Sequence, residues 1–300
     1  MNNNFEVIGI FLLLLLGVWI LPFISTVGFG QTYNQTSLVN TTVNITNTAP
    51  TVFDVTISSS ISLVAYSNFI LECNATTYDY NNDTLEVNGT FHQSIVGSSG
   101  AADQNYRYYN TSCTPLTMQD YSMNWSCTFP LNYFTNNGTW YCNVTANDIR
   151  NASQSNISLL GTVNPLVAIK MDAVLDYGQL EANDISNDTV ANITNAGNRD
   201  ANISVMGYGA AEGDTYAMIC SGGGTIPLSN ERYSRTNGTA YASMTQLTGT
   251  SVNMTNFFVP QRLSEGADSV NSTFWRIQIP PSASGICNGK ILFTASDRGN

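Results

Sequence analysis

Few side chains in this sequence have the types and spacing that enzyme chemistry needs. His92 is the single histidine of the chain, so a Ser-His-Asp or Cys-His catalytic pair would have to use it. The segment Gly97–Gly100 has the wrong spacing for a G-x-S-x-G nucleophile motif. The Asp-Thr-Gly and Asp-Ser-Gly sequences of aspartic proteases are absent. We therefore expect no enzymatic activity.

One segment has the spacing of a metal-binding loop. Asp79, Asn81 and Asp83 place three oxygen-bearing side chains on alternate residues, as calcium loops do. The glycine and the distal glutamate of the twelve-residue calcium loop are missing. A polar β-turn accounts for the same residues without an ion. The segment is a candidate calcium site, and a turn is the alternative; no other cofactor is expected.

The six cysteines indicate disulfides. No two are spaced C-x-x-C, and the single histidine gives no close Cys/His pair, so zinc sites are not indicated. An even number of well-separated cysteines is typical of exported proteins. Sequence alone leaves the connectivity open, because four cysteines in the first half allow three pairings. The preferred pairs are Cys73–Cys142, Cys113–Cys127 and Cys220–Cys287.

Acceptor sequences for N-linked glycans are unusually frequent. Eighteen of the 36 asparagines begin Asn-x-Ser/Thr with x other than proline, whereas this composition would give about seven by chance. The excess predicts a surface that carries glycans. The candidate asparagines are Asn34, Asn40, Asn44, Asn74, Asn82, Asn88, Asn110, Asn124, Asn137, Asn143, Asn151, Asn156, Asn187, Asn192, Asn202, Asn237, Asn253 and Asn271.

The charge balance excludes one large class of partners. Only 10% of the 300 residues are charged, and 10 Lys+Arg against 21 Asp+Glu give a net charge of −11. Such a chain cannot neutralise a run of phosphates, so nucleic acid is not an expected partner. The hydrophobic content of 43% is enough for folded cores.

The N-terminus predicts the compartment. Residues 7–24 read VIGIFLLLLLGVWILPFI and contain no charged side chain. A length of eighteen apolar residues is the lower limit for a membrane-spanning helix. Residues 1–30 are either a cleaved signal peptide, with a mature start at Gln31, or an uncleaved signal anchor. A pilin-type assembly helix led by Glu6 is a third interpretation. All three place the rest of the chain outside the cytoplasmic membrane, secreted or at the cell surface.

The elements that must position these residues are predicted to be strands. Val52–Ile57, Phe69–Thr76, Asn124–Phe129 and Gly138–Ala146 show strand alternation and are separated by turn residues. Short strands at such spacing favour an antiparallel sandwich. No stretch after residue 31 sustains a helical period over three turns.

The second half has the same character. Two runs, 189–194 and 201–206, flank an Asn-Ala-Gly-Asn turn and predict a hairpin. In the later run 274–279, Trp275, Ile277 and Ile279 share one face, which we expect to be the core face because the other face would bury Arg276.

These patterns divide the chain into five parts. We expect an export or anchor segment, a polar glycosylated linker, a first β-sandwich with four cysteines, a second linker, and a second β-sandwich with two cysteines. Their respective bounds are 1–30, 31–49, 50–149, 150–165 and 166–300. The predicted fold class is all-β, with two antiparallel sandwiches after an N-terminal hydrophobic helix.

The segment Gly138–Ala146 resembles the F strand of an immunoglobulin-like domain. Trp140 occupies the position of the tyrosine two residues before the strand's cysteine, here Cys142, and Cys73 resembles the partner cysteine of the B strand. No tryptophan follows Cys73 at the usual C-strand distance, and Cys113 with Cys127 is an additional pair. The resemblance implies an immunoglobulin-like sandwich for the first half.

The second half resembles the immunoglobulin-like β modules of archaeal and bacterial surface proteins. The similarity lies in the pattern V-A-N-I-T-N-A-G-N-x-D-A-N-I-S-V over residues 190–205. It implies a fold and no particular chemistry.

The sequence as a whole favours a non-enzymatic cell-surface glycoprotein. Its role would be structural or adhesive, through contacts with other surface proteins or glycans, with membrane attachment by residues 7–24 if they stay in place. One alternative is an extracellular solute- or sugar-binding module, with or without calcium. The other is a pilin-like filament subunit assembled through the N-terminal helix.

Overall fold

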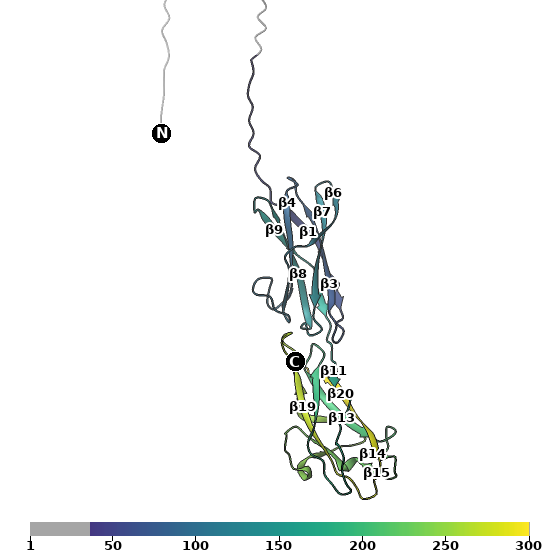
Figure 1. The fold of residues 1–300 in the computed structure, drawn as a ribbon. Coiled ribbons are helices and arrows are strands. Elements are labelled where there is room, and N and C mark those ends of the chain that lie inside the picture. Colours follow the sequence, from purple (N-terminus) through teal and green to yellow (C-terminus); the bar gives the residue numbers. More distant parts are fainter. Residues whose placement is uncertain (1–36, 300) are drawn as a thin grey trace, which may run out of the picture. The chain divides into compact units, whose positions relative to one another are not determined.

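The computed structural model describes residues 37–299, which are all-β apart from two short 3-10 turns, η1 (Leu228–Asn230) and η2 (Tyr241–Ser243). Its four sheets are antiparallel except where β2 and β10 pair in parallel. No helix among these residues is long and apolar enough to cross a membrane. The predicted export or anchor helix at 7–24 lies outside the described residues. Figure 1 shows these sheets and labels many of their strands.

Residues 37–50 contain no helix or strand. Residues 37–49 belong to the predicted polar linker 31–49. Residues 37–45 form part of a unit separate from residues 46–300. Most side chains of 37–45 are exposed, including the apolar side chains of Leu38, Val39, Val43 and Ile45. Asn47 is tied to the folded part, because its amide donates to Asp148 Oδ2 at 2.6 Å.

The first two sheets form what we call the N-terminal lobe. One sheet has the order β1 (Thr51–Thr56), β3 (Phe69–Tyr78), β7 (Ser122–Leu131) and β6 (Thr114–Gln119). The other has the order β2 (Ser60–Ile61), β10 (Gly161–Val163), β8 (Gly138–Asp148), β4 (Thr84–Gln93) and β5 (Arg107–Asn110), and β9 (Ser153–Ile157) also pairs with β8.

The strand order explains the sequence resemblance. The first sheet follows the order A-B-E-D of the immunoglobulin fold, and β4 and β8 take the places of strands C and F. Trp140 on β8 is fully buried, stacks on Phe91 with ring centroids 4.7 Å apart, and donates its indole N–H to the carbonyl of Asn136. That bond to backbone a few residues upstream is the one made by the tyrosine of immunoglobulin domains.

Residues 150–165 differ from the predicted linker. They contain β9 and β10, which both pair with β8 and complete the second sheet. Every side chain of β9 is exposed, because the strand lies at the sheet edge and covers no core. A strand of this kind has no hydrophobic alternation, so its sequence looks like a linker.

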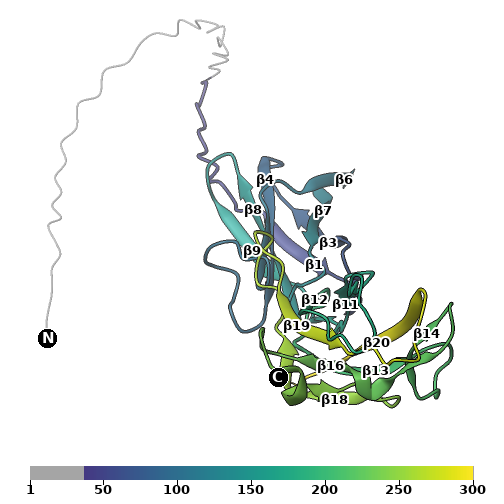
Figure 2. The ribbon, with the colours of Figure 1, turned by 60° about the horizontal axis from the view of Figure 1, so that its bottom comes forward.

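The other two sheets form the C-terminal lobe. One has the order β11 (Ile169–Met171), β12 (Thr189–Asn195), β19 (Val270–Ile277), β16 (Glu231–Ser234) and β17 (Thr245–Gln246). The other has the order β15 (Thr225–Pro227), β14 (Tyr216–Cys220), β20 (Cys287–Asp297), β13 (Ala201–Tyr208) and β18 (Val252–Val259). Figure 2 shows both sheets from a second side.

Two features of this lobe test the predicted strands. Trp275 and Ile277 of β19 are buried and Ile279 packs against the same core, which confirms the predicted core face. The predicted hairpin is wrong: β12 pairs with β11 and β19, whereas β13 pairs with β18 and β20 in the opposite sheet. The Asn-Ala-Gly-Asn segment therefore carries the chain from one sheet to the other.

Each lobe has its own hydrophobic core. One cluster runs from Val52 to Val163 and the other from Ala191 to Ile277, and no buried residue belongs to both. By strand pairing the first lobe extends to Val163 and the second begins at Ile169. That each lobe is a domain able to fold alone stays a prediction.

Candidate functional site

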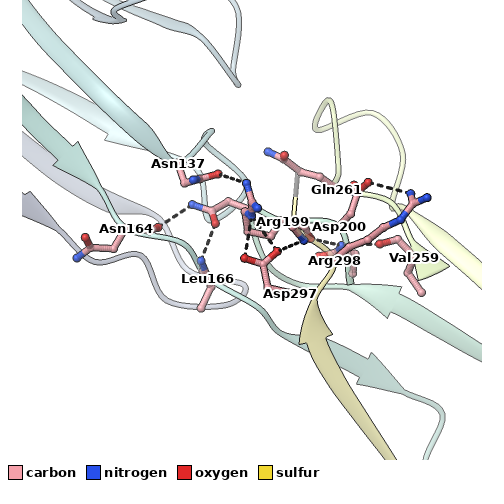
Figure 3. A network of polar contacts seen from close by, with 12 residues as sticks. Asn137, Asn164, Leu166, Arg199, Asp200, Val259, Gln261, Asp297 and Arg298 are labelled. Carbon is pink, nitrogen blue, oxygen red and sulfur yellow. Dashed lines mark hydrogen bonds and ion pairs between the residues drawn. The ribbon is translucent and has the colours of Figure 1, made fainter. Parts of the chain in front are cut away.

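The most concentrated polar structure is the joint between the two lobes. Asn198, at the crossing from β12 to β13, has no exposed surface. Its amide donates to the carbonyls of Thr135 and Asn164, both at 3.0 Å, and its Oδ1 accepts from the backbone N–H of Leu166. One buried side chain thus ties the β7–β8 loop, the chain between the lobes and the C-terminal lobe together. Figure 3 shows Asn164 and Leu166 of this network.

A second group of contacts lies beside it. The Gln261 amide donates to the carbonyl of Phe134 and to Asn136 Oδ1, each at 2.7 Å. The buried Asn105 donates to the carbonyls of Phe134 and Arg262, at 3.1 Å each. Both lobes contribute donors and acceptors, so the joint has a fixed hydrogen-bond pattern.

Charged groups border the joint. Arg199 pairs with Asp297 at 3.0 Å and also donates to Asn137 of the N-terminal lobe (Figure 3). The guanidinium of Arg262 lies 5.0 Å from the ring centroid of Phe134. These groups hold the two lobes in contact with each other.

The candidate calcium residues form a turn. The buried Asp79 carboxylate accepts hydrogen bonds from the backbone N–H groups of Asn81 and Asp83 and from the hydroxyl of Thr84. Burial favours the neutral form of Asp79, but these hydrogen bonds outweigh it and lower its pKa. The Asn81 side chain donates instead to Asn47.

These contacts argue for the turn and against the ion. Desolvation and the neighbouring carboxylates of Asp79 and Asp148 raise the pKa of Asp83. Residues 37–299 contain no group of three or more His, Cys, Asp or Glu side chains that could hold a metal ion. The three predicted residues therefore act together as a structural turn, with Asp79 as its acceptor.

His92 is buried in β4. Its Nδ1 lies 3.2 Å from the carbonyl of Gln93, and its Nε2 has no hydrogen-bond partner. Burial lowers the pKa of His92, and the nearby Arg107 lowers it further. A neutral imidazole inside a sheet, with no nucleophile or carboxylate bonded to it, is suited to packing.

All six cysteines are joined, in the pairs preferred from the sequence. Cys73–Cys142 links β3 to β8 across the two sheets of the N-terminal lobe. Cys113–Cys127 closes a short loop onto β7, and Cys220–Cys287 joins β14 to β20.

The predicted glycan acceptors lie at the surface. Seventeen of the eighteen fall within the described residues, and none of them is buried. Eleven are exposed, and six are half-buried: Asn88, Asn110, Asn137, Asn143, Asn202 and Asn271. Asn34 lies outside the described residues. Attachment of glycans stays a prediction.

One surface pocket has the size of a small-ligand site. It has a volume of about 350 Å³ and lies between β16 and β17 of one sheet and β18 of the other. We call it the Tyr233 pocket. Its lining combines hydroxyl groups, the guanidinium-bearing Arg235 and the buried Met244 and Met254.

Sequence reasoning missed a buried carboxyl group. Glu231 of β16 is 1% exposed inside the C-terminal lobe, and the Tyr177 hydroxyl donates to it at 2.7 Å. Burial raises the pKa of Glu231 to about 7, against the opposing effect of that hydrogen bond. A glutamate between an asparagine and an arginine gives no sequence signal of burial.

No protein-family model and no curated protein matches the chain. Among solved structures, it is similar to a chain of the CsuC–CsuE chaperone–tip adhesion subunit complex from Csu pili of Acinetobacter baumannii. The identity is 8%, the match covers 80% of this chain and 99% of that one, and the TM-score is 0.38. A chaperone–tip adhesin complex of CFA/I fimbriae gives 10% identity, coverage of 81% and 80%, and a TM-score of 0.33.

A third similar structure is the C-terminal domain of the antigen I/II-family protein AspA of Streptococcus pyogenes. Its identity is 10%, the match covers 84% of this chain and 96% of that one, and its TM-score is 0.25. These likenesses are remote in sequence and in backbone, and the functional argument rests on the residues of this chain.

Proposed function

We propose that this protein works outside the cytoplasmic membrane as a non-enzymatic surface protein with a structural or adhesive role. The observation that carries the proposal is the pairing of all six cysteines, with one disulfide between the sheets of the N-terminal lobe and one between strands of the C-terminal lobe. Structural disulfides persist in oxidising compartments. The exposed glycan acceptors and the fixed joint support the same role.

Thiol labelling on intact cells tests the compartment. Cells that produce the full chain are treated with an alkylating reagent before and after reduction, and the cysteines are read by mass spectrometry. We expect alkylation of all six only after reduction. Labelling of any of the three pairs before reduction would contradict the exported placement. A matched measurement on a cytoplasmic protein of the same cells controls for permeability.

A test of adhesion follows from the proposed contacts. Purified full-length protein is applied to arrays of surface glycans and to cell-surface protein extracts. Saturable binding to glycans or to surface proteins supports the adhesive role. If the protein binds neither, the structural role is the one that remains. Hydrolysis of an applied glycan or peptide that is lost on a carboxylate substitution would overturn the non-enzymatic assignment.

The Tyr233 pocket supports a second candidate function, saccharide binding. Hydroxyl groups and Arg235 offer several hydrogen-bond partners around a cavity of about 350 Å³. Ser243→Trp would fill the pocket, and Thr250→Trp is the control, because Thr250 is also exposed but does not line it. Glycan binding lost only in Ser243→Trp supports the pocket. Binding that both variants retain contradicts it.

A further inference from the structure

One edge of β20 has no partner strand. In the N-terminal lobe, β8 has β4 on one side and β9 with β10 on the other. In the C-terminal lobe, β20 pairs with β13 over Lys290–Asp297, and β14 continues the same antiparallel register over Cys287–Gly289; the opposite side of β20 faces away from β13. Among the described residues, no strand pairs with that side of residues 291–297. Its backbone groups are free for another strand.

The side chains of this edge are apolar and only partly covered. Ile203 and Val205 of β13 are 0% and 1% exposed, while their direct partners on β20, Ala295 and Phe293, are only half-buried. Ile291 is half-buried on the same face. The hydrophobic side chains of β13 are thus fully covered, whereas those of β20 are only partly covered.

The opposite sheet is open on the same side. Met171 of β11 is half-buried, whereas its partner Ile193 on β12 is 0% exposed. The Tyr233 pocket shows that the margin at β16 and β17 lies next to the margin at β18. Beside residues 291–297 the second sheet ends at β20, so this margin and the margin at β11 share the other side of the sandwich, and Figures 1 and 2 both draw β11 and β20 near each other.

The chain itself contains a segment that fits such an edge. Val39, Thr41, Val43 and Ile45 alternate with polar residues, which is the period of a β-strand. Val39, Val43 and Ile45 are 79%, 83% and 77% exposed, so nothing covers these apolar side chains. The glycan acceptors Asn40 and Asn44 lie on the opposite face, where sugars would not obstruct pairing. Segments 39–45 and 291–297 have the same length.

This segment cannot reach β20 of its own chain. Asn47 is bonded to Asp148, at one end of β8, and the other end of β8 adjoins Asn137, which contacts Arg199 beside Asp297 of β20. The eleven residues of β8 place those ends about 33 Å apart. The eight residues from Val39 to Asn47 span at most about 29 Å, and Ile45 lies within about 7 Å of Asn47. A strand formed by residues 39–45 therefore has to come from another copy.

We propose that residues 39–45 of one copy add as a β-strand to the free edge of β20 in a second copy. Backbone hydrogen bonds supply the attachment, and Val39, Val43 and Ile45 cover the half-buried row Ile291, Phe293 and Ala295. The two contacting surfaces differ, so the interaction runs head to tail and extends into open chains or closes into rings. The proposed surface role stands whether or not copies join.

The first test compares two lysine substitutions in the full-length chain. Val43→Lys places a charge on the apolar face, and Leu38→Lys places the same charge outside it; neither alters an Asn-x-Ser/Thr sequence. Sedimentation velocity at rising concentration should give growing oligomers for wild type and Leu38→Lys. Val43→Lys should remain a single chain at a tenfold higher concentration. Equal assembly of the two variants, or an absence of oligomers in wild type, would overturn the proposal.

The second test locates the contact. A labelled peptide of residues 37–47 is added to full-length Val43→Lys protein, and binding is followed by fluorescence anisotropy and amide hydrogen exchange. The peptide should bind saturably and protect the amides of 291–297 that point away from β13, and a Val43→Lys peptide should bind at least tenfold more weakly. Protection at β17 or β18 instead would contradict the assignment. So would protection, before the peptide is added, of those amides of 291–297 that point away from β13.

Discussion

Asparagine serves two opposite purposes in this protein. The acceptor asparagines lie at the surface, and many offer their amides to solvent. Asn195 and Asn198, by contrast, have no exposed surface and have hydrogen bonds on both side-chain atoms. A buried amide is tolerated only when its hydrogen bonds are made. The composition that predicts a glycosylated surface therefore also supplies the internal ties of the fold.

The buried Glu231 should make stability depend on pH. Its folded pKa of about 7 lies above the ordinary value of 4.5. Between these values the folded state keeps a proton that the unfolded state has lost. Its contribution is therefore fully present below about pH 4.5 and is lost as pH rises through 7. We expect this group to lower the unfolding free energy by about 3 kcal/mol between pH 4.5 and pH 8.

Denaturant unfolding at pH 5 and pH 8 measures this effect. Glu231→Gln keeps an acceptor for Tyr177 and cannot ionise, so its stability should change less over that range than that of wild type. Glu212→Gln is the matched control, because Glu212 is exposed. The same pH dependence in wild type and Glu231→Gln would show that Glu231 is not the titrating group.

Asp79 is expected to stabilise its turn without an ion. Asp79→Ala removes an acceptor from two backbone N–H groups and from Thr84. Losing it should lower the unfolding free energy by about 1–3 kcal/mol. Glu72→Ala, at an exposed position of β3, should change it much less. Thermal unfolding with and without calcium completes the measurement, and a rise in the wild-type Tm on adding calcium would restore the metal hypothesis.

At the scale of elements, strands that face a core were predictable from their residues. Val52–Ile57, Phe69–Thr76 and Gly138–Ala146 all fall on observed strands, because one buried face forces alternation. The strand β9 was not predictable, since its exposed side chains carry no such pattern. The predicted hairpin between β12 and β13 was wrong for another reason. Alternation identifies strands but does not indicate the sheet to which each strand belongs.

The candidate sites, like the strands, include features that the sequence predicts and features that it does not predict. The disulfide pairs agree with the preferred set because the strand pattern places Cys73 and Cys142 on buried faces of facing strands. The joint at Asn198 could not be predicted, because its partners Thr135 and Asn164 are distant in sequence and offer only backbone carbonyls. Because these contacts use backbone atoms, the residue types at these positions do not indicate them.

The two disulfides of the N-terminal lobe should differ in their effect on stability. Cys73–Cys142 spans 69 residues and Cys113–Cys127 spans 14. Loop-closure entropy then assigns about 4 kcal/mol to the first and about 3 kcal/mol to the second. Replacing each pair by alanines and measuring urea unfolding compares them. A larger loss for the Cys113–Cys127 pair would contradict the entropic account.

At the scale of the whole molecule, the joint determines whether the lobes act as one body. Each lobe has a separate hydrophobic core, while the contacts between them are mainly polar and centred on Asn198. The joint resembles the interfaces between domains, which are more polar than a hydrophobic core.

Removing the central tie should uncouple the lobes but leave both folded. Asn198→Ala leaves the carbonyls of Thr135 and Asn164 and the N–H of Leu166 without their partner, at a cost of about 3 kcal/mol or more. Calorimetry should then show two unfolding transitions where wild type shows one. Amides of the two cores should keep their protection against exchange, while the amide of Leu166, whose N–H loses its acceptor, should lose its protection. Asn288→Ala, at an exposed position of β20, is the control and should keep the wild-type profile. A single transition in Asn198→Ala, shifted to lower temperature, would instead show that the lobes fold as one unit and that the predicted division into two domains is wrong.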